Sequence, residues 1–302
     1  MSIKNWILIW VFLELSSFRF IIISKNGRTT ERIIKYFLIQ TIRSIFILLS
    51  ISIKTSFIFQ KRINWNINSS LLLLIRILIK GGLAPIHFWI PNVADGLRLK
   101  RLRIFLTIQK LAPTSIFILM VNLNFIFIII LICSVIGTFR QILTLNLKLL
   151  LTYSSISHSG WILIGRISKI EVYFLYLIIY TTIILQILII LYKKQIFSIL
   201  FLSINKPLLI LFLRLSGIPP LLGFFPKWIS LINILSDDKM KLLSLFLILL
   251  TCLNIFIYVK IIRIRILKTI IKLNIKNKIE IKPLFSFYSN FFIIPLLITF
   301  RM

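Results

Sequence analysis

One glutamate and three lysines lie within long apolar stretches of this sequence, where charged side chains are costly. They are Glu14 in "WVFLEL", Lys80 in "LIKGGLAP", Lys110 in "IQKLAP" and Lys227 in "GFFPKW". Ionisable groups at membrane depth are functional candidates by default, and the alternative is snorkelling or accidental placement. Burial favours the neutral amine of lysine, whereas a nearby carboxylate favours its charged form. These four residues therefore predict proton transfer inside a membrane.

Both histidines could join this chemistry, because imidazole titrates near neutral pH. His158 lies in "YSSISHSGW" and is selected with the glutamate and the lysines as a proton-translocation residue. His87 in "APIHFW" is the weaker candidate, and either histidine could instead be a hydrogen-bonded packing group. Arginine keeps its proton, so arginines in apolar stretches are expected to be counter-charges or to snorkel to the interface. There are four of these: Arg19, Arg43, Arg76 and Arg214.

The elements that carry these residues are membrane spans. Of the 302 residues, 59% are apolar, and the mean hydropathy is +1.03. The net charge of +30 lies mostly in loops, which argues against a nucleic-acid partner. Cys133 and Cys252 lie far apart, so neither a disulfide framework nor a metal or iron–sulfur site is supported. We expect a single transmembrane domain over residues 1–302, with no nucleotide or redox motif of its own.

The hydropathy pattern predicts an all-α, polytopic helix bundle. If residues 207–235 form one helix broken at "SGIPP", the chain has ten spans, and loops on one side hold 21 Lys and Arg against 9 on the other. If they form two spans, the counts become 16 and 14, so the positive-inside rule favours ten. The expected spans are 5–23, 36–53, 69–90, 104–121, 125–139, 149–165, 172–192, 207–235, 242–259 and 284–300.

Two of these spans are expected to be interrupted, at "KGGLAP" and at "SGIPPLLGFFPKW". Glycine permits unwinding and proline removes a backbone donor. Broken helices at membrane depth are tolerated only where the freed backbone faces protein or a wet cavity, and they often mark a translocation site. We therefore expect a wet pocket beside Lys80, with Glu14 as its partner.

Several motifs occur in the order and spacing of one known family, over residues 10 to about 235: "WVFLEL", "TTERIIKYFLIQ", "IKGGLAPIHFWIPNV", "IQKLAP", "LTYSSISHSGW" and "LSGIPPLLGFFPKW". The sequence resembles the NADH dehydrogenase (ubiquinone) subunit 2 family, the mitochondrially encoded antiporter-like subunits of respiratory complex I. The resemblance implies that Glu14 and Lys80 form the family's glutamate–lysine pair. Lys110 matches its central-axis lysine and Lys227 its distal lysine.

The same resemblance implies a multi-pass subunit of the mitochondrial inner membrane that translocates protons while partner subunits transfer electrons from NADH to ubiquinone. NADH, FMN, iron–sulfur clusters and ubiquinone are then expected in those partners, and no cofactor or metal in this chain. The expected partners are other membrane-arm subunits and lipids, with loops 24–35, 91–103 and 260–283 facing the matrix. The alternatives are a stand-alone cation/proton antiporter and a structural spacer of the membrane arm.

The sequence also departs from this family. Relatives usually carry one further helix before "WVFLEL", so this chain is expected to be shortened at its start. A lysine expected shortly before "YSS" is replaced by Leu149, with Lys148 adjacent. The four arginines within the spans occupy positions that are commonly uncharged, which changes how the interior charge is balanced.

Overall fold

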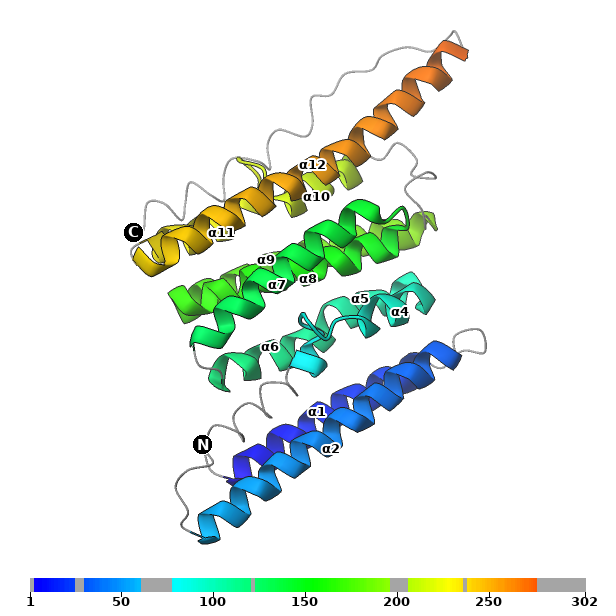
Figure 1. Cartoon of the computed structure of the whole chain (residues 1–302). Helices are drawn as coiled ribbons and strands as arrows, with labels where there is room; N and C mark the ends of the chain where they lie inside the picture. Colours follow the sequence, from blue (N-terminus) through cyan, green and yellow to red (C-terminus); the bar gives the residue numbers. More distant parts are fainter. Residues whose placement is uncertain are drawn as a thin grey trace.

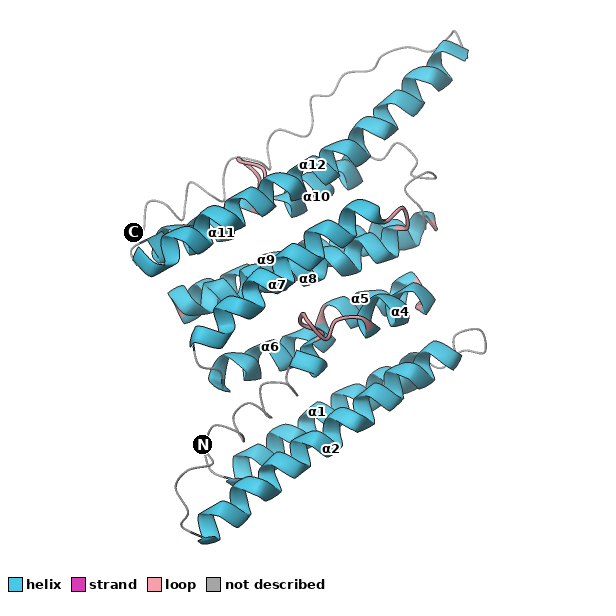
Figure 2. Ribbon diagram, viewed as in Figure 1, coloured by secondary structure: helices cyan, strands magenta, loops and turns pink. Residues whose placement is uncertain are grey.

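The computed structural model describes residues 3–24, 30–60, 78–120, 123–195, 206–235 and 238–275, and these residues form helices joined by loops (Figure 2). Arg76 and the expected span 284–300 lie outside the described residues. The helices are α1 (Ile3–Ser24), α2 (Thr30–Gln60), α4 (Trp89–Gly96), α5 (Leu99–Leu106), α6 (Ile108–Met120), α7 (Leu123–Leu143), α8 (Leu147–Ser168), α9 (Ile170–Lys194), α10 (Lys206–Ser216), α11 (Phe224–Leu235) and α12 (Asp238–Ile275).

The helices follow one another in space in the order of the sequence (Figure 1). The pair α1 and α2 lies beside α4 to α6, which lie beside α7 to α9, and α10 to α12 complete the bundle. Helix α8 packs against α7, α9, α4 and α11, so it contacts both halves of the chain. Polar groups on α8 can therefore connect sites that are far apart in the sequence.

Small residues allow α7 and α8 to pack closely. A Cβ added to Gly137 of α7 would meet the backbone of Ser157, and one added to Gly160 of α8 would meet the Ile130 carbonyl. Close backbone approach through small residues is the usual packing mode of membrane helices. The buried hydroxyls of Ser154 and Ser157 donate to carbonyls three residues earlier in α8, so the helix itself satisfies them.

By length and composition, three helical segments in the described part of the chain could cross a membrane: Ile126–Leu143, Ile170–Lys194 and Lys241–Arg263. Pro207–Ser216 and Phe224–Leu235 are shorter apolar helices. The chain is thus a helical membrane protein. The total of ten spans remains a prediction.

Three expected boundaries were wrong. Most of residues 91–103, expected as a loop, is helical in α4 and α5, because Leu99, Leu102 and Phe105 bury one face of α5. The expected span 104–121 is divided at Thr107, between α5 and α6. At this break the Thr107 hydroxyl donates to the Arg103 carbonyl at 2.7 Å, and such a bond to the carbonyl four residues earlier often bends a helix. Helix α12 continues to Ile275, so part of the expected loop 260–283 is helical.

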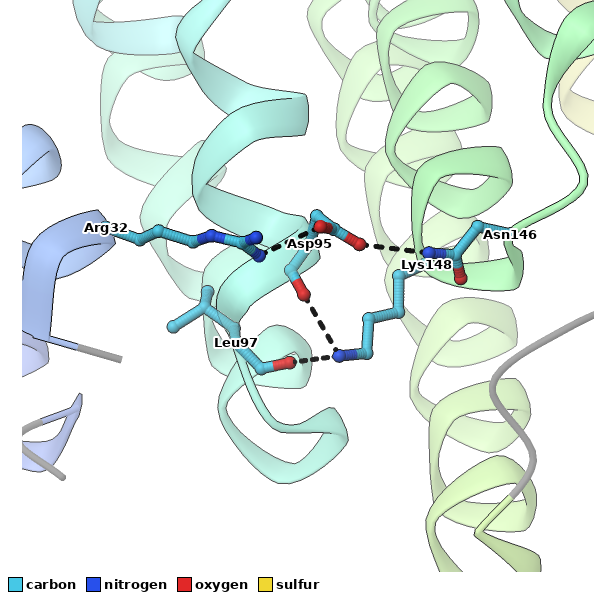
Figure 3. Close-up of polar contacts among 5 residues, drawn as sticks. All are labelled: Arg32, Asp95, Leu97, Asn146 and Lys148. Carbon is cyan, nitrogen blue, oxygen red and sulfur yellow. Dashed lines mark hydrogen bonds and ion pairs between the residues drawn. The ribbon is translucent and has the colours of Figure 1, made fainter. Parts of the chain in front are cut away.

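A polar cluster ties α2, α4 and the start of α8 together at one end of the bundle (Figure 3). We call it the Asp95 cluster. Arg32 Nη1 donates to Asp95 Oδ2 at 2.9 Å, and Asn146 Nδ2 donates to Asp95 Oδ1 at 2.9 Å. Lys148 Nζ donates to the carbonyls of Asp95 (3.1 Å) and Leu97 (2.8 Å), near the end of α4. The lysine beside Leu149 therefore belongs to this cluster.

Candidate functional site

The first predicted helix break is confirmed. The helix that carries Lys80 ends at Gly81, and α4 begins at Trp89. Gly82 has a φ of +60°, a conformation that side chains with a Cβ disfavour. The freed backbone is held by neighbours, since the Ala84 amide donates to Cys133 Sγ of α7 at 3.2 Å. The break is therefore buried against protein, as such breaks require at membrane depth.

Lys80 is buried at this break, with 8% of its surface exposed. Its Nζ and Glu14 Oε1 have no hydrogen-bond partner among the described residues. Lys80 and Arg43 both lie within electrostatic range of Glu14. The ion pairs of the described residues with an N–O distance within 4.0 Å are Arg32–Asp95 and Glu31–Lys35, and Glu14 takes part in neither. The predicted Glu14–Lys80 pair is thus brought together as neighbouring charges and not as a contact ion pair.

A small cavity of about 10 Å³ joins Lys80 to Lys110. Roughly 10–15 Å³ is enough for one water molecule. Besides the two lysines, the cavity is lined by Tyr36, Gln40, Arg43, Gly81, Trp89, Ile90, Phe105 and Gln109. A small cavity lined by both Lys80 and Lys110 is therefore present beside the first break, and the wet pocket expected there stays a prediction.

Lys110 continues the polar line into α8. Its Nζ donates to Ser155 Oγ at 2.7 Å, and Ser155 Oγ donates to the Thr152 carbonyl at 2.6 Å. Lys110 lies one turn after the break at Thr107. The sequence reasoning did not predict this further interruption at Thr107.

His158 lies one turn further along α8 and joins α8 to its neighbours. Its Nδ1 is 2.8 Å from the Tyr176 hydroxyl of α9, and it hydrogen-bonds to the backbone of Leu215 near the end of α10. It also lines a second small cavity with Arg214. His87, in contrast, bonds to the carbonyl of Pro85 at 3.1 Å and packs on Phe88, which is a local contact within the first break.

The second predicted break is also confirmed. Helix α10 ends at Ser216, Gly217 has a φ of +83°, and α11 begins at Phe224. Lys227 is 4% exposed, and its Nζ donates to the Ser216 carbonyl at 2.9 Å. The same Nζ lies 5.8 Å from the centre of the Trp161 ring on α8. Lys227 thus binds the carbonyl end of the helix that the break interrupts.

The arginines within the spans differ in ways that the sequence did not indicate. Arg19 is exposed on α1, as expected for a residue that snorkels. Arg43 is 1% exposed, and its Nη1 donates to the carbonyl of Lys80 at 3.3 Å. Sequence reasoning did not select Ser155, and it expected Arg43 only as a counter-charge or as a side chain that snorkels. Burial of both depends on tertiary packing, which the sequence pattern alone does not give.

Comparisons with known proteins agree with this fold. The family model described as NADH:quinone oxidoreductase/Mrp antiporter, transmembrane, matches residues 4–254. The chain is similar to NADH-ubiquinone oxidoreductase chain 2 of Metachirus nudicaudatus, with 34% identity over 278 residues that cover 85% of this chain and 79% of the relative. The corresponding protein of Anopheles gambiae is 30% identical over 275 residues, covering 86% and 79%.

Two solved structures share the fold. Respiratory complex I from Thermus thermophilus with bound aureothin contains a chain with a TM-score of 0.73 and 21% identity, covering 84% of this chain. This chain spans 64% of the length of that Thermus chain. The Mrp complex from Dietzia sp. DQ12-45-1b gives a TM-score of 0.71 and 15% identity, covering 83% of this chain and 55% of the other. The chain belongs to the NADH:quinone oxidoreductase/Mrp antiporter membrane family, with the NADH-ubiquinone oxidoreductase chain 2 proteins among its relatives.

Proposed function

We propose that this chain is a proton-translocating membrane subunit of an NADH:ubiquinone oxidoreductase of the mitochondrial inner membrane. The relatives carry the name of that enzyme's chain 2. The observation that carries the proposal is the cavity shared by Lys80 and Lys110, continued by the Lys110–Ser155 hydrogen bond. NADH, FMN, iron–sulfur clusters and ubiquinone are assigned to partner subunits, and this chain is assigned no cofactor.

The proposed path runs through the middle of the bundle. A proton moves from Lys80 to Lys110 across the cavity, then passes near Ser155 and His158 to Lys227. Each lysine is buried or partly buried, which brings its charged and neutral forms closer in free energy than they are in water. The free energy comes from electron transfer in the partner subunits and reaches this chain as a change in charge near Glu14.

The span count and orientation belong to the same proposal. With 11 and 12 residues, α10 and α11 would measure about 17 and 18 Å at 1.5 Å per residue, roughly half of a bilayer core each. Both helices contact α12 and lie alongside it in Figure 1, which supports one broken eighth span. The segments 24–35, 91–103 and 260–283, which are helical in part, then face the matrix. Labelling of residues 260–283 from the intermembrane side would overturn this orientation.

Lys110→Met tests the function, because methionine keeps the length of the side chain but cannot carry a proton. In the assembled complex the variant should lose at least about tenfold in NADH-driven proton uptake and quinone reduction together, the scale expected when a proton-transfer group is removed. Arg19→Gln, on the exposed face of α1, is the matched control. Normal pumping by Lys110→Met would favour the structural-spacer reading.

A stand-alone cation/proton antiporter is the second candidate. Two observations favour it: the chain shares its fold with a chain of the Mrp complex, and the description of the matching family names Mrp antiporters beside NADH:quinone oxidoreductases. The isolated chain, reconstituted in liposomes with a pH gradient, should not exchange sodium for protons if the first proposal holds. Exchange by the isolated chain would favour the antiporter.

A further inference from the structure

Arg43 is a buried cation that the proposed path does not use. Its Nε donates to the Ile39 carbonyl at 2.9 Å, and its Nη1 to the Lys80 carbonyl at 3.3 Å. The guanidinium lies 4.8 Å from the Trp89 ring centre and 5.9 Å from that of Tyr36. A guanidinium in the membrane interior keeps its charge, so this site holds a permanent positive charge beside Lys80.

A buried cation is costly unless an anion compensates it. Glu14 is the carboxylate within electrostatic range of Arg43 in the described structure, and it lies within range of Lys80 as well. The described charged or titratable groups that line the cavity are Tyr36 and Arg43 from α2, Lys80 before the break and Lys110 from α6, while α4 and α5 contribute Trp89, Ile90 and Phe105. Glu14 of α1 lies within electrostatic range of Lys80 and Arg43, and Cys133 of α7 within range of Lys110. The site is therefore a triad of Glu14, Arg43 and Lys80.

The net charge of the triad decides which form of Lys80 is balanced. With Arg43 present, the triad is neutral when Lys80 is neutral and carries one positive charge when Lys80 is protonated. Without Arg43, the triad would be neutral only when Lys80 is protonated, and loss of that proton would leave a lone carboxylate. An unbalanced charge in a low-dielectric site is disfavoured, so Arg43 changes which protonation state is stable.

We propose that Arg43 is a positioning residue for proton transfer: its fixed charge compensates Glu14, so that Lys80 can release its proton without leaving an unbalanced anion. In that step an N–H bond of the Lys80 ammonium breaks, and its electron pair stays on Nζ. The proton forms a new N–H bond on the neutral amine of Lys110, across the cavity that both line. The inference rests on the proposed function.

The test compares the pH profile of NADH-driven proton uptake in the assembled complex between variants of the triad. Arg43→Gln keeps a donor for the Lys80 carbonyl but removes the charge. Its profile should move toward alkaline pH by about one to two units, the shift expected for a charge about 6–10 Å away at an effective dielectric constant near 20. Arg43→Lys should shift the profile less than Arg43→Gln, because lysine carries a positive charge there but, unlike arginine, can release its proton.

Two further variants separate charge from packing. Glu14→Gln should move the profile toward acidic pH, and Glu14→Gln with Arg43→Gln should return it near the unmodified position, because both charges are removed together. A merely structural arginine would give lower uptake with no shift and no restoration by the double variant, and either result would overturn the proposal. Glu14→Gln provides the opposite shift even if Arg43→Gln does not assemble.

Lys110→Met, measured in the same membranes, separates the two proposals. If it pumps normally, the proposed function fails. If it stops pumping while Arg43→Gln keeps the unmodified profile, the role of Arg43 fails and the function stands. Arg19→Gln removes a positive charge from the same half of the chain at an exposed position, and it should leave the profile unchanged.

Discussion

Each of the two predicted helix breaks has a lysine beside it, but the lysine precedes the first break and follows the second. At the first break Lys80 precedes the interruption, and another residue, Arg43, binds the carbonyl that the break leaves free. At the second break Lys227 follows the interruption and binds the Ser216 carbonyl itself. In the first site the amine lies beside a cavity and two other charged side chains, whereas in the second a carbonyl dipole and the Trp161 ring hold it.

This difference suggests that the two breaks have different roles in proton transfer. A lysine surrounded by charges responds to a change in any one of them, because charge–charge interactions are strong at low dielectric constant. A lysine held by a carbonyl and a ring face is less sensitive to distant charges and is fixed in position. The first break is therefore suited to receive the driving signal, and the second to hold a proton near the end of the path.

The largest effect is expected at Lys227 in the second break, where a substitution can separate binding of the Ser216 carbonyl from release of a proton. Lys227→Arg can still donate to the Ser216 carbonyl, but arginine does not release its proton. The complex should assemble with near-normal stability and lose at least about tenfold in proton uptake, the usual scale for loss of a proton-transfer group. Lys227→Met should lose uptake and also stability. Full uptake by Lys227→Arg would mean that Lys227 only binds the carbonyl.

The next effect compares the glycines of the two breaks. Gly82 and Gly217 both have positive φ, so alanine should cost about 1–2 kcal/mol at either position. An added Cβ would meet the side chain of Ile90 at the first break but Lys227 Nζ at the second. Thermal stability of the complex should fall in both variants, while proton uptake per assembled complex should fall mainly in Gly217→Ala. Equal loss of uptake in both would contradict this contrast.

Much of this contrast could be predicted from sequence, because the signals were local. "KGGLAP" and "SGIPP" combine residues that end helices, so both breaks were predicted correctly, and Lys80, Lys110 and Lys227 were selected by their depth in apolar runs. The partners of these lysines come from other helices. The Lys110–Ser155 bond and the contact of Arg43 with the first break depend on how α8 and α2 pack in the bundle.

The predicted boundaries between helices and loops were wrong where charged residues fit either a loop or a helix surface. The charges of residues 91–103 favoured a loop, but α4 and α5 bury their apolar residues, while Lys100 is exposed and Asp95 and Arg101 bond to neighbouring elements. Lys148 stood next to the position of an expected axial lysine. A shift of one residue on a helix rotates a side chain by about 100°, and Lys148 accordingly bonds to the loop after α4.

A smaller effect tests the coupling between charges at the first break. Glu14→Gln and Lys80→Met should each lower proton uptake and quinone reduction, and the double variant should lose less than the sum of the two in free energy of activation. Both single changes disturb one interaction, which can be lost only once. Steady-state uptake measured for all four forms gives the coupling. Strict additivity would indicate that Glu14 and Lys80 act independently.

The smallest effect is expected at the Asp95 cluster, which joins the helix after the first break to α2 and α8. Asp95→Asn removes the ion pair with Arg32 but keeps an oxygen that can accept from Asn146. Because the side chains of Arg32 and Asp95 are 43% and 36% exposed, solvent screens the pair, and its loss should cost about 0.2–1 kcal/mol. Lys148 still binds the carbonyls of Asp95 and Leu97, so α4 stays attached to α8.

Thermal unfolding of the complex at low and high salt measures the effect of Asp95→Asn, which should shrink as salt is raised. A large, salt-independent loss of proton uptake in Asp95→Asn would show that the first break depends on this exposed cluster as much as on its buried charges.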